Sequence, residues 1–452
     1  MEDKLTKDIE KARDIAKAAG ARGGRAFFAG GFVRDELLGL ENKDIDVEVH
    51  GIPAEELKEI LEDFGEVIII GKSFGVYSLR GHNIDIAMPR KEKNTGRGHR
   101  DFEIFTDPFL GPEAAARRRD FTINSIMKDV LSGEIIDSYG GREDLEKGIL
   151  RHIDSDAFVE DPLRVLRGAQ FAARFNLKVA PETMELCRGI DISELPKERV
   201  EAELEKGLCK SSRPSVFFEV LREMNQLDIW FPELKRLIGL EQDPVFHPEG
   251  DVWVHTMECL DKAVNYHEQV EEPFRFMLAV LTHDFGKAEV TEVIKGRIHS
   301  YEHEKAGAPL IDKFLRRITG NREVISYVEN MAQLHMRPNM LAYDKSTVKA
   351  TNRMFDESVC PEELILFSAI DMSSERYEGE GEDNLKFLRE RLEIFRELMA
   401  RPYVMGRDLV DAGLEPDENF GEILEYAHKL RLAGVDKEPA LKQVLAFARK
   451  GK

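Results

Sequence analysis

The stretch that decides the fold is residues 28–49, FAGGFVRDELLGLENKDIDVEV. From Lys43 onward acidic and apolar side chains alternate, which predicts a β-strand with one buried face. In such a strand Asp44, Asp46 and Glu48 point to the same side, with successive carboxylates about 7 Å apart at the backbone. The alternation alone leaves two interpretations open: the solvated face of a half-buried strand, or carboxylates that bind metal ions together.

The surroundings of this strand favour the second interpretation. Gly30 and Gly31 follow a strand-like run and lead into a helix start, where backbone N–H groups can approach a phosphate. A second alternating segment, NIDIAMP, places Asp85 on another predicted strand, as a third ligand or a base. Carboxylate oxygens are the ligands that Mg²⁺ prefers. A glycine pair is common in turns, so these neighbours favour a metal and phosphate site without deciding the question.

The charge of the chain limits the partners that it can bind. Its 452 residues are enough for roughly two to four domains, and its formal net charge of −21 argues against a general nucleic-acid footprint. A basic segment at residues 90–100, RKEKNTGRGHR, is followed by a second basic island at residues 116–120. We predict that the first segment contacts RNA, with an exposed solvated loop as the alternative. The candidate residues are Arg90, Lys91, Lys93, Arg97 and Arg100.

The sequence also predicts a compartment. No apolar run approaches the ~20 residues that span a bilayer, and residues 1–20 read as a charged amphipathic helix instead of a signal peptide. The four cysteines have no CxxC spacing and indicate neither a zinc site nor a disulfide framework. We therefore expect a cytoplasmic protein with no membrane partner.

Strand and helix signals divide the chain into an α/β part and a long helical part. Short β-branched or aromatic runs occupy residues 25–89, and a helix is predicted over residues 53–65. From about residue 150 onward amphipathic helices follow one another and strand signals nearly vanish. The predicted fold class is α+β, with an α/β head followed by all-α parts.

Four ordered motifs resemble the class II tRNA nucleotidyltransferases, the CCA-adding enzymes, which have bacterial poly(A) polymerases as close relatives. The motifs are GGFVRD, DID, RRRDFTINSI and EDPLRVLRGAQFAARF, and they fall within residues 25–210. The resemblance implies a polymerase-β-like nucleotidyltransferase head. It also implies the transfer of CMP, CMP and AMP from CTP and ATP to the 3′ end of tRNA.

The resemblance further implies roles for individual residues. Asp44 and Asp46 are expected to bind two catalytic Mg²⁺ ions, whereas Glu48 matches no ligand of the family and is expected to be a solvated strand residue. The implied nucleotide-binding residues are Gly30, Gly31 and Arg34 near the triphosphate, Arg119, Asp120 and Asn124 at the ribose, Asp161 and Arg164 at the base, and Arg167 on the same helical face as these two.

Several of these residues also have plainer interpretations. Asp161, directly before a proline, is typical of a helix N-cap. Yet Asp161, Arg164 and Arg167 share one helical face, where an acceptor and a forked donor suit the edge of a base. Asp120 and Asn124 are predicted at positions i and i+4 of a helix, where a local side-chain hydrogen bond is the alternative to a ribose site.

A second constellation lies in the helical part and resembles the HD-type metal-dependent phosphohydrolases. It includes HPEGDVWVHT at residues 247–256, LTHDFGK at residues 281–287, and later histidines and an aspartate. The implied ligands are His255, His283, Asp284 and Asp371, with His303 and His335 at positions that bind a second metal in some members. This donor set suits Ni²⁺, Mn²⁺ or Zn²⁺ as well as Mg²⁺. In proteobacterial CCA-adding enzymes such a domain carries phosphatase and 2′,3′-cyclic phosphodiesterase activities. We hypothesise that this chain has the same activities.

These features predict a division of the chain and two competing functions. The predicted segments are an N-terminal helix at 1–24, a nucleotidyltransferase head at 25–148, a helical neck and body at 149–240, an HD domain at 241–395 and a helical tail at 396–452. One rival is a CC-adding enzyme, an A-adding enzyme or a poly(A) polymerase. The other is an RNA-binding HD phosphohydrolase with an inactive head. The sequence leaves the oligomeric state open between monomer and homodimer.

Overall fold

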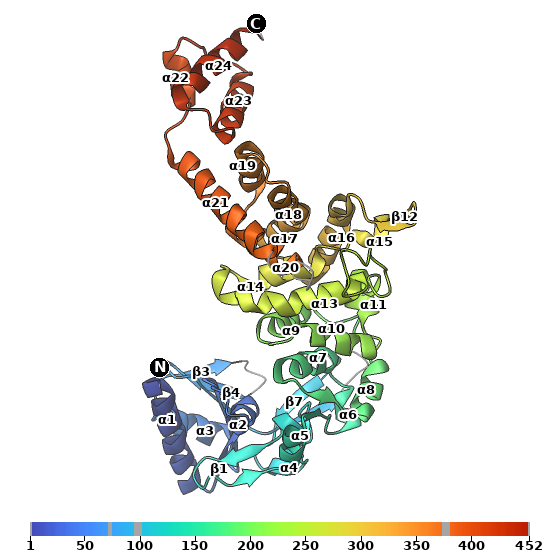
Figure 1. The fold of residues 1–452 in the computed structure, drawn as a ribbon. Helices are drawn as coiled ribbons and strands as arrows, with labels where there is room; N and C mark the ends of the chain where they lie inside the picture. The colour runs from blue at the N-terminus through green and yellow to red at the C-terminus, as the bar shows by residue number, and fades with distance from the viewer. Residues whose placement is uncertain (1, 71–74, 95–101, 373–379, 451–452) are drawn as a thin grey trace. The chain divides into compact units, whose positions relative to one another are not determined.

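The computed structural model describes the chain except for residues 1, 71–74, 95–101, 373–379 and 451–452 (Figure 1). The chain forms two compact units, one of residues 1–204 with 216–226 and one of residues 205–215 with 227–452. Within the described part of the chain, no helix is both long and apolar enough to cross a bilayer.

The first unit is built on a mixed sheet, which has seven strands among the described residues, in the order β3-β4-β5-β2-β1-β8-β9. Strands β2 and β5 pair in parallel, and the other neighbours pair antiparallel. The strands are β1 (Arg25–Ala29), β2 (Ile45–His50), β3 (Val67–Ile70), β4 (Val76–Leu79), β5 (Ile84–Ala87), β8 (Met127–Asp129) and β9 (Ile135–Ile136). The predicted strands of residues 25–89 are therefore confirmed, and the predicted α+β fold class is confirmed with them.

Three helices lie close to this sheet: α1 (Glu2–Ala21), α2 (Gly31–Leu37) and α3 (Ala54–Glu62). Figure 1 shows α1 and α3 side by side near the sheet, where their apolar residues share one core with its strands. The buried face of α1 includes Ala12, Ile15 and Ala19. The N-terminal helix is thus part of the core of the head.

The rest of the first unit is mostly helical. It contains a separate β-ribbon of β6 (Arg90–Asn94) and β7 (Phe102–Thr106) and a short pair of β10 (Ile149–Leu150) and β11 (Lys178–Val179). The other elements are α4 (Pro112–Ala116), η1 (Thr122–Asn124), α5 (Gly141–Lys147), α6 (Ser155–Phe158), α7 (Leu163–Phe175), α8 (Pro181–Arg188), α9 (Lys197–Cys209), whose end enters the second unit, and α10 (Ser215–Glu223).

The second unit is nearly all helical. Its helices are α11 (Leu227–Trp230), α12 (Pro232–Lys235), α13 (Val252–Ala263), η2 (Val264–Gln269), α14 (Pro273–Thr282), α15 (Lys287–Val290), α16 (His303–Ile318), α17 (Arg322–Leu334), α18 (Met336–Tyr343), α19 (Val348–Glu357), α20 (Pro361–Asp371), α21 (Glu380–Ala400), α22 (Gly406–Asp411), α23 (Phe420–Leu432) and α24 (Lys437–Lys450).

The expectation of all-α parts after the head is wrong at two places: the short pair of β10 and β11 lies in the predicted neck, and one hairpin lies in the predicted HD region. Strands β12 (Glu292–Ile294) and β13 (Arg297–His299) pair antiparallel. The two residues between them, Lys295 and Gly296, have φ of +52° and +80°. Two central residues with positive φ are the requirement of a tight two-residue hairpin turn, and the short strands gave too weak a periodic signal to be predicted.

Candidate active sites

Three aspartates lie on or directly before β2 and β5 of the first unit. Asp46 and Asp85 are register partners in the parallel pairing of these strands, which places both side chains on one face. Asp44 immediately precedes β2, and its backbone N–H donates to Asn42 Oδ1 over 3.0 Å. The pKa of Asp46 is raised to about 6, first by partial removal of its carboxyl group from water and then by the charges of Asp85 and Asp44. The side chain of Asp46 still reaches solvent. A divalent cation would relieve this repulsion, and an all-oxygen donor set fits a hard cation.

The glycine turn lies beside these carboxylates. A side-chain carbon added at Gly30 would stand 3.6 Å from Asp46 Oδ2 and 3.4 Å from Arg119 Nη1. Gly30 also has a φ of +61°, in the left-handed region that favours glycine. The turn therefore brings bare backbone to the carboxylates and to a guanidinium, as the approach of an anionic ligand requires.

The prediction that Glu48 is a solvated strand residue is wrong. Its carboxylate is largely buried, lies 2.8 Å from His50 Nε2, and accepts a hydrogen bond from Arg119 Nη2 over 3.0 Å. Burial alone would raise the pKa of Glu48, but the contacts with His50 and Arg119 outweigh it and lower the pKa. Arg119 Nη1 donates in turn to the backbone oxygen of Asn124 over 2.9 Å. Glu48 therefore holds Arg119 between the acidic strand and the predicted ribose site.

A buried polar network surrounds the predicted ribose site. The prediction that Asp120 and Asn124 lie on one regular helix is wrong: Asn124 ends the short 3₁₀ turn η1, and Asp120 precedes it. The predicted local hydrogen bond is present, since Asn124 Nδ2 donates to Asp120 Oδ1 over 2.9 Å. Arg167 Nε donates to Asp120 Oδ2 over 2.7 Å, and Arg34 Nη1 donates to Asn124 Oδ1 over 2.6 Å. Burial would raise the pKa of Asp120, but Arg167 and Asn124 outweigh it and lower the pKa. The network joins η1 to α7 and to α2.

Arg34 lies deeper than the resemblance implies. It is only 4% exposed, and its Nε and Nη2 donate to Asp35 Oδ1 over 2.8 and 2.6 Å. Its guanidinium also stands over the ring of Phe175, 4.2 Å from the centroid. Arg34 therefore holds the side chain of Asn124 through a buried hydrogen bond, and Asp35 balances the charge of Arg34.

The start of α7 carries the two residues expected at the base. The N-cap position of α7 belongs to Pro162 and not, as predicted, to Asp161. Asp161 Oδ1 still accepts from the backbone N–H of Leu163 over 3.2 Å, and Oδ2 pairs with Arg199 over 3.0 Å. Arg164 donates from Nη1 and Nη2 to the backbone oxygens of Ala157 and Arg118, over 2.6 and 2.7 Å. These contacts give the guanidinium a fixed orientation at the helix start.

The predicted RNA-binding segment is described only in part. Arg90 begins β6 and pairs with Thr106 of β7. The backbones of Lys91 and Lys93 continue that strand. Arg97 and Arg100 lie outside the described residues. RNA contact by this segment stays a prediction.

In the second unit the six predicted histidines and aspartates come together. His255 Nε2 lies 3.1 Å from Asp371 Oδ1, and His283 Nε2 lies 3.2 Å from Asp284 Oδ2. His303 Nε2 lies 3.3 Å from Asp284 Oδ1 and 3.1 Å from His335 Nε2. The cluster gathers α13, α16, α20 and the junctions after α14 and α17, all within this unit.

Each imidazole ring of the cluster is fixed through its Nδ1. Three of the acceptors are backbone oxygens: that of Val280 lies 2.8 Å from His283, that of Ser300 2.9 Å from His303 and that of Ala332 2.6 Å from His335. The fourth is Glu249 Oε1, 2.8 Å from His255. Partners on Nδ1 set the tautomer and turn each Nε2 inward, which is the usual support of metal-binding histidines.

The cluster fits a divalent metal. His283 Nε2 is buried and has no hydrogen bond of good geometry to any residue that the structure describes. Burial, together with the charge of His283, lowers the pKa of His335 to about 3, so its imidazole is neutral as a ligand must be. Burial would raise the pKa of Asp284, but the charges of His283 and Lys287 hold it well below its usual range. Imidazole nitrogens beside ionised carboxylates form a donor set for a transition metal.

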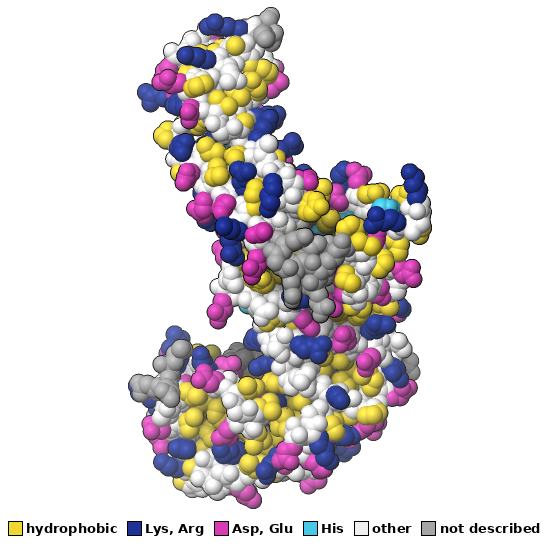
Figure 2. All heavy atoms as spheres, viewed as in Figure 1, with side chains coloured by type: hydrophobic (Ala, Val, Ile, Leu, Met, Phe, Trp, Pro, Cys, Tyr) yellow, Lys and Arg dark blue, Asp and Glu magenta, His cyan; other side chains and the backbone are white. Residues whose placement is uncertain are grey.

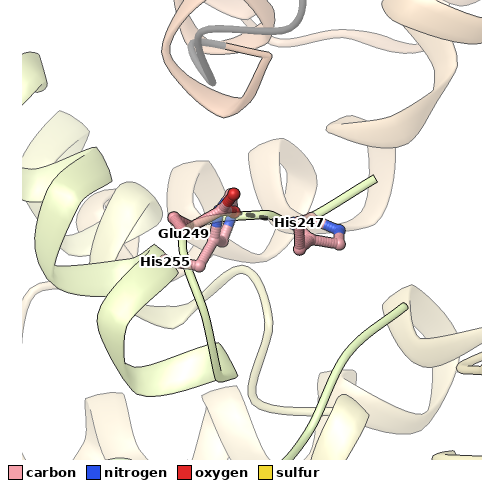
Figure 3. Close-up of side chains that lie close together, drawn as sticks. All are labelled: His247, Glu249 and His255. Atoms are coloured by element: carbon pink, nitrogen blue, oxygen red, sulfur yellow. Dashed lines mark hydrogen bonds and ion pairs between the residues drawn. The ribbon is translucent and has the colours of Figure 1, made fainter. Parts of the chain in front are cut away.

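Two residues that support this cluster were not predicted. Glu249 Oε1 lies 2.9 Å from His247 Nδ1 as well as 2.8 Å from His255 Nδ1, and Figure 3 shows both rings turned toward it. Lys287 Nζ lies 2.7 Å from Asp284 Oδ2. The i,i+3 spacing in HDFGK could have indicated Lys287. Glu249 lies in a loop before α13, where no periodic rule applies.

A close backbone contact positions His303. A side-chain carbon added at Gly286 would stand 1.9 Å from the backbone oxygen of His303 and 2.5 Å from the backbone nitrogen of Gly307. Only a residue without a side chain lets the turn after α14 pack this tightly on the start of α16.

We therefore expect Gly286→Ala to destabilise the second unit by ~1–3 kcal/mol, because the backbone of α16 must move away. Differential scanning calorimetry of the metal-free protein measures the loss. The matched control is Gly421→Ala, on a helix with open space around the added carbon, which should leave the melting temperature unchanged or higher. Equal melting of both variants would contradict the close packing.

The comparisons with known proteins agree with this arrangement. Residues 26–151 match the family model described as Poly A polymerase head domain. The multifunctional CCA protein of Alkalilimnicola ehrlichii is 34% identical over 408 residues, covering 86% of this chain and 94% of that protein. The multifunctional CCA protein of Aromatoleum aromaticum is 40% identical over 289 residues, covering 63% of this chain and 68% of that protein.

Solved structures share the fold. A CCA-adding enzyme in its apo form II aligns with a TM-score of 0.66 at 22% identity, covering 97% of this chain and 96% of that chain. The CCA-adding enzyme of Thermotoga maritima, solved in complex with tRNA, aligns with a TM-score of 0.63 at 22% identity, covering 98% of both chains. With a relative of this identity matched over nearly its whole length, the chain belongs to the multifunctional CCA protein family of tRNA nucleotidyltransferases.

Proposed function

We propose that this chain adds C, C and A to the 3′ end of tRNA, using CTP and ATP, and that Asp44, Asp46 and Asp85 hold two Mg²⁺ ions for the transfer. The observation that carries the proposal is the group of three carboxylates beside the Gly30 turn, in which the pKa of Asp46 is raised to about 6 by burial and by the neighbouring carboxylates. The family membership supports it, as do the related enzymes solved with tRNA, with ATP and with CTP.

In the proposed reaction the 3′-oxygen of tRNA attacks the α-phosphorus of the nucleotide, and the bond to the β-phosphate breaks to release pyrophosphate. Bound Mg²⁺ would lower the pKa of the attacking hydroxyl and stabilise the charge of the leaving group. The Gly30 turn admits the triphosphate, and Arg119, held by Glu48 and the Asn124 backbone, presents a fixed cation beside it.

Selection of C and then A is assigned to the start of α7. Asp161 offers a carboxylate oxygen and Arg164 a fixed forked donor on one helical face, which together suit two-point hydrogen bonding to a base edge. The Asp120–Arg167 pair ties this helix to η1, so the ribose and base sites keep a constant spacing.

Glu48→Gln is expected to raise the KM for both CTP and ATP about 10-fold. The neutral side chain no longer holds Arg119 through a charge-assisted hydrogen bond, a contact of about 1.5–3 kcal/mol. Steady-state kinetics on tRNA that lacks its 3′ CCA measure the effect. Glu66→Gln, in the exposed pair with Arg80, should leave both constants unchanged. Equal values for Glu48→Gln and the wild-type enzyme would remove Glu48 from the site.

The function is tested with three tRNA transcripts that end before the CCA, after the first C and after the second C. With CTP alone the first should gain two nucleotides and the second one. With ATP alone only the third should grow, by one. Repeated addition of A to any transcript would favour a poly(A) polymerase, and extension that stops at C in all conditions would favour a CC-adding enzyme.

A second activity is favoured by the histidine cluster. We propose that His255, His283, Asp284 and Asp371 bind a divalent transition metal such as Ni²⁺ or Mn²⁺, and that the site hydrolyses phosphomonoesters and 2′,3′-cyclic phosphodiesters. In the second case water adds to phosphorus and one P–O(ribose) bond breaks, leaving a phosphomonoester and a free hydroxyl. The fixed Nε2 atoms and the ionised Asp284 support this proposal, and His303 and His335 are available for a second ion.

We also propose a domain division that follows these sites. The head at 25–148 would be completed by the N-terminal helix at 1–24, since α1 shares its core. The helical neck and body at 149–240 would hold the base-reading helix. The HD domain at 241–395 and the tail at 396–452 would follow.

A further inference from the structure

The histidine cluster opens into a cavity of about 600 Å³ in the second unit. Asp284, His303 and Asp371 line one part of it. A volume of this size is far larger than a phosphate group needs and lies within the range of sites for nucleotide-sized ligands. The rest of the cavity wall can therefore contact the group to which the phosphate is attached.

That wall contains large apolar side chains that are not buried. Phe246, Met340 and Tyr343 line the cavity and are 47%, 58% and 76% exposed. His299 also lines it, and its ring stacks on Tyr301 with centroids 4.9 Å apart. Figure 2 shows apolar side chains gathered beside the β12–β13 hairpin, with a histidine at their edge. Flat, exposed rings next to a phosphate site are the features of a stacking platform for nucleobases.

A cationic group and an amide lie at this wall: Asn339 lines the cavity, and Arg297 stands near the lining residue Phe246. Arg297, on the hairpin, has its guanidinium carbon 5.8 Å from the centroid of Phe246 and is held by Asp243 over 2.8 Å. Asn339 donates Nδ2 to the backbone oxygen of Ser368 over 3.1 Å, which fixes the orientation of its amide at the cavity. These groups can form hydrogen bonds with the edge of a base that stacks on the exposed rings.

We propose that this wall is a nucleobase subsite, in which Phe246 and Tyr343 stack on the base of a nucleotide whose 2′,3′-cyclic phosphate lies at the histidine cluster. The inference rests on the proposed hydrolase function and names the residues that would hold the base of its substrate, a nucleotide that is free or at the 3′ end of an RNA. Stacking accepts any base, so the subsite selects nucleotides over other phosphodiesters without reading sequence.

The test compares two cyclic phosphates with the same reacting ring, adenosine 2′,3′-cyclic phosphate and glycerol 1,2-cyclic phosphate, on the full-length protein with Ni²⁺ or Mn²⁺. Phe246→Ala and Tyr343→Ala should each raise the KM for the adenosine compound about 5- to 100-fold and leave kcat/KM for the glycerol compound within twofold. The matched control is Val245→Ala: this neighbour is 46% exposed and is not among the described residues that line the cavity. A short RNA ending in a 2′,3′-cyclic phosphate forms a second arm, which shows whether free nucleotides or RNA ends are preferred.

Equal losses on the adenosine and glycerol compounds, or no loss on either, would overturn the subsite. Binding of 2-aminopurine riboside 2′,3′-cyclic phosphate gives a readout that needs no hydrolysis, because stacking quenches its fluorescence. Quenching by the wild-type and Val245→Ala proteins, but not by Phe246→Ala, is expected. If the wild-type protein hydrolyses neither compound but shows this quenching pattern, the hydrolase proposal fails and the base subsite stands. No quenching by the wild-type protein overturns the subsite.

Discussion

Asp46→Asn is expected to lower the rate of nucleotide addition to tRNA by about 10³-fold or more. Asp46 lies opposite Asp85 on the parallel strands β2 and β5, where both carboxylates would hold the proposed Mg²⁺ ions. Loss of a ligand removes several kcal/mol of charge stabilisation from the transition state, and about 1.4 kcal/mol corresponds to a factor of ten in rate. Single-turnover addition of CMP to tRNA lacking its CCA end measures the change, and Asp44→Ala should behave in the same way.

The same substitution should not unfold the protein. The pKa of Asp46 is raised to about 6 by burial and by Asp85, above the value of about 3.9 for an unfolded chain. The folded state therefore binds this proton more tightly, and its contribution to stability is lost as the pH rises through about 6. Asparagine removes the charge, so at pH 7 and without metal Asp46→Asn should melt at the same temperature as the wild type or higher. Near-normal addition by a well-folded Asp46→Asn protein would contradict the assignment.

His283→Ala combined with Asp284→Ala is expected to abolish metal-stimulated hydrolysis of 2′,3′-cyclic nucleotides while leaving nucleotide addition within about twofold. Both residues are almost fully buried, and each contributes atoms to the centre of the cluster. Removing them takes away two of the four proposed primary ligands, which leaves too few donors for a transition metal. Parallel assays of hydrolysis and CMP addition on one preparation measure the two activities.

Metal removal provides a control that needs no mutation. After chelation and dialysis, Ni²⁺ or Mn²⁺ should restore hydrolysis by the wild-type protein, and Mg²⁺ alone should restore addition. Loss of both activities in the double variant would contradict the picture of two separate sites. So would full hydrolysis by the double variant.

The sequence predicted the strands of the head and the shared face of their carboxylates well, because both depend on a local period. The alternation in residues 43–49 indicated which side chains share a face, and Asp46 and Asp85 do meet as register partners. It could not show that Glu48 is covered and hydrogen-bonded, because its partner Arg119 comes from a distant segment. Alternation distinguishes the two faces of a strand but not whether the outer face is covered by another part of the chain.

In the second unit the resemblance predicted which histidines and aspartates could act as ligands, and sequence patterns did not predict the residues that support them. Glu249 reaches His255 from an irregular loop, and the carbonyl groups that fix the other three rings belong to the backbone. Backbone carbonyls carry no sequence signature. The β12–β13 hairpin was missed for a related reason, since three-residue strands are too short for a period to appear.

The network around Asn124 was the least predictable part. Arg34 was expected near a triphosphate because of its motif, yet it lies buried against Asp35 and Phe175. A buried arginine needs a charged partner and several acceptors, and these come from α2 and η1 together. Only the folded arrangement of these elements shows that Arg34 holds the side chain of Asn124 in place.

The most direct test of the whole account is to incubate the purified protein with Mg²⁺, all four nucleoside triphosphates and a tRNA that ends before its CCA, and to sequence the 3′ ends. We expect nearly every product to end in CCA and growth to stop there, while the Asp46→Asn protein leaves the tRNA unchanged. Tails of A, products ending in CC, or no addition by the wild-type protein would contradict this expectation.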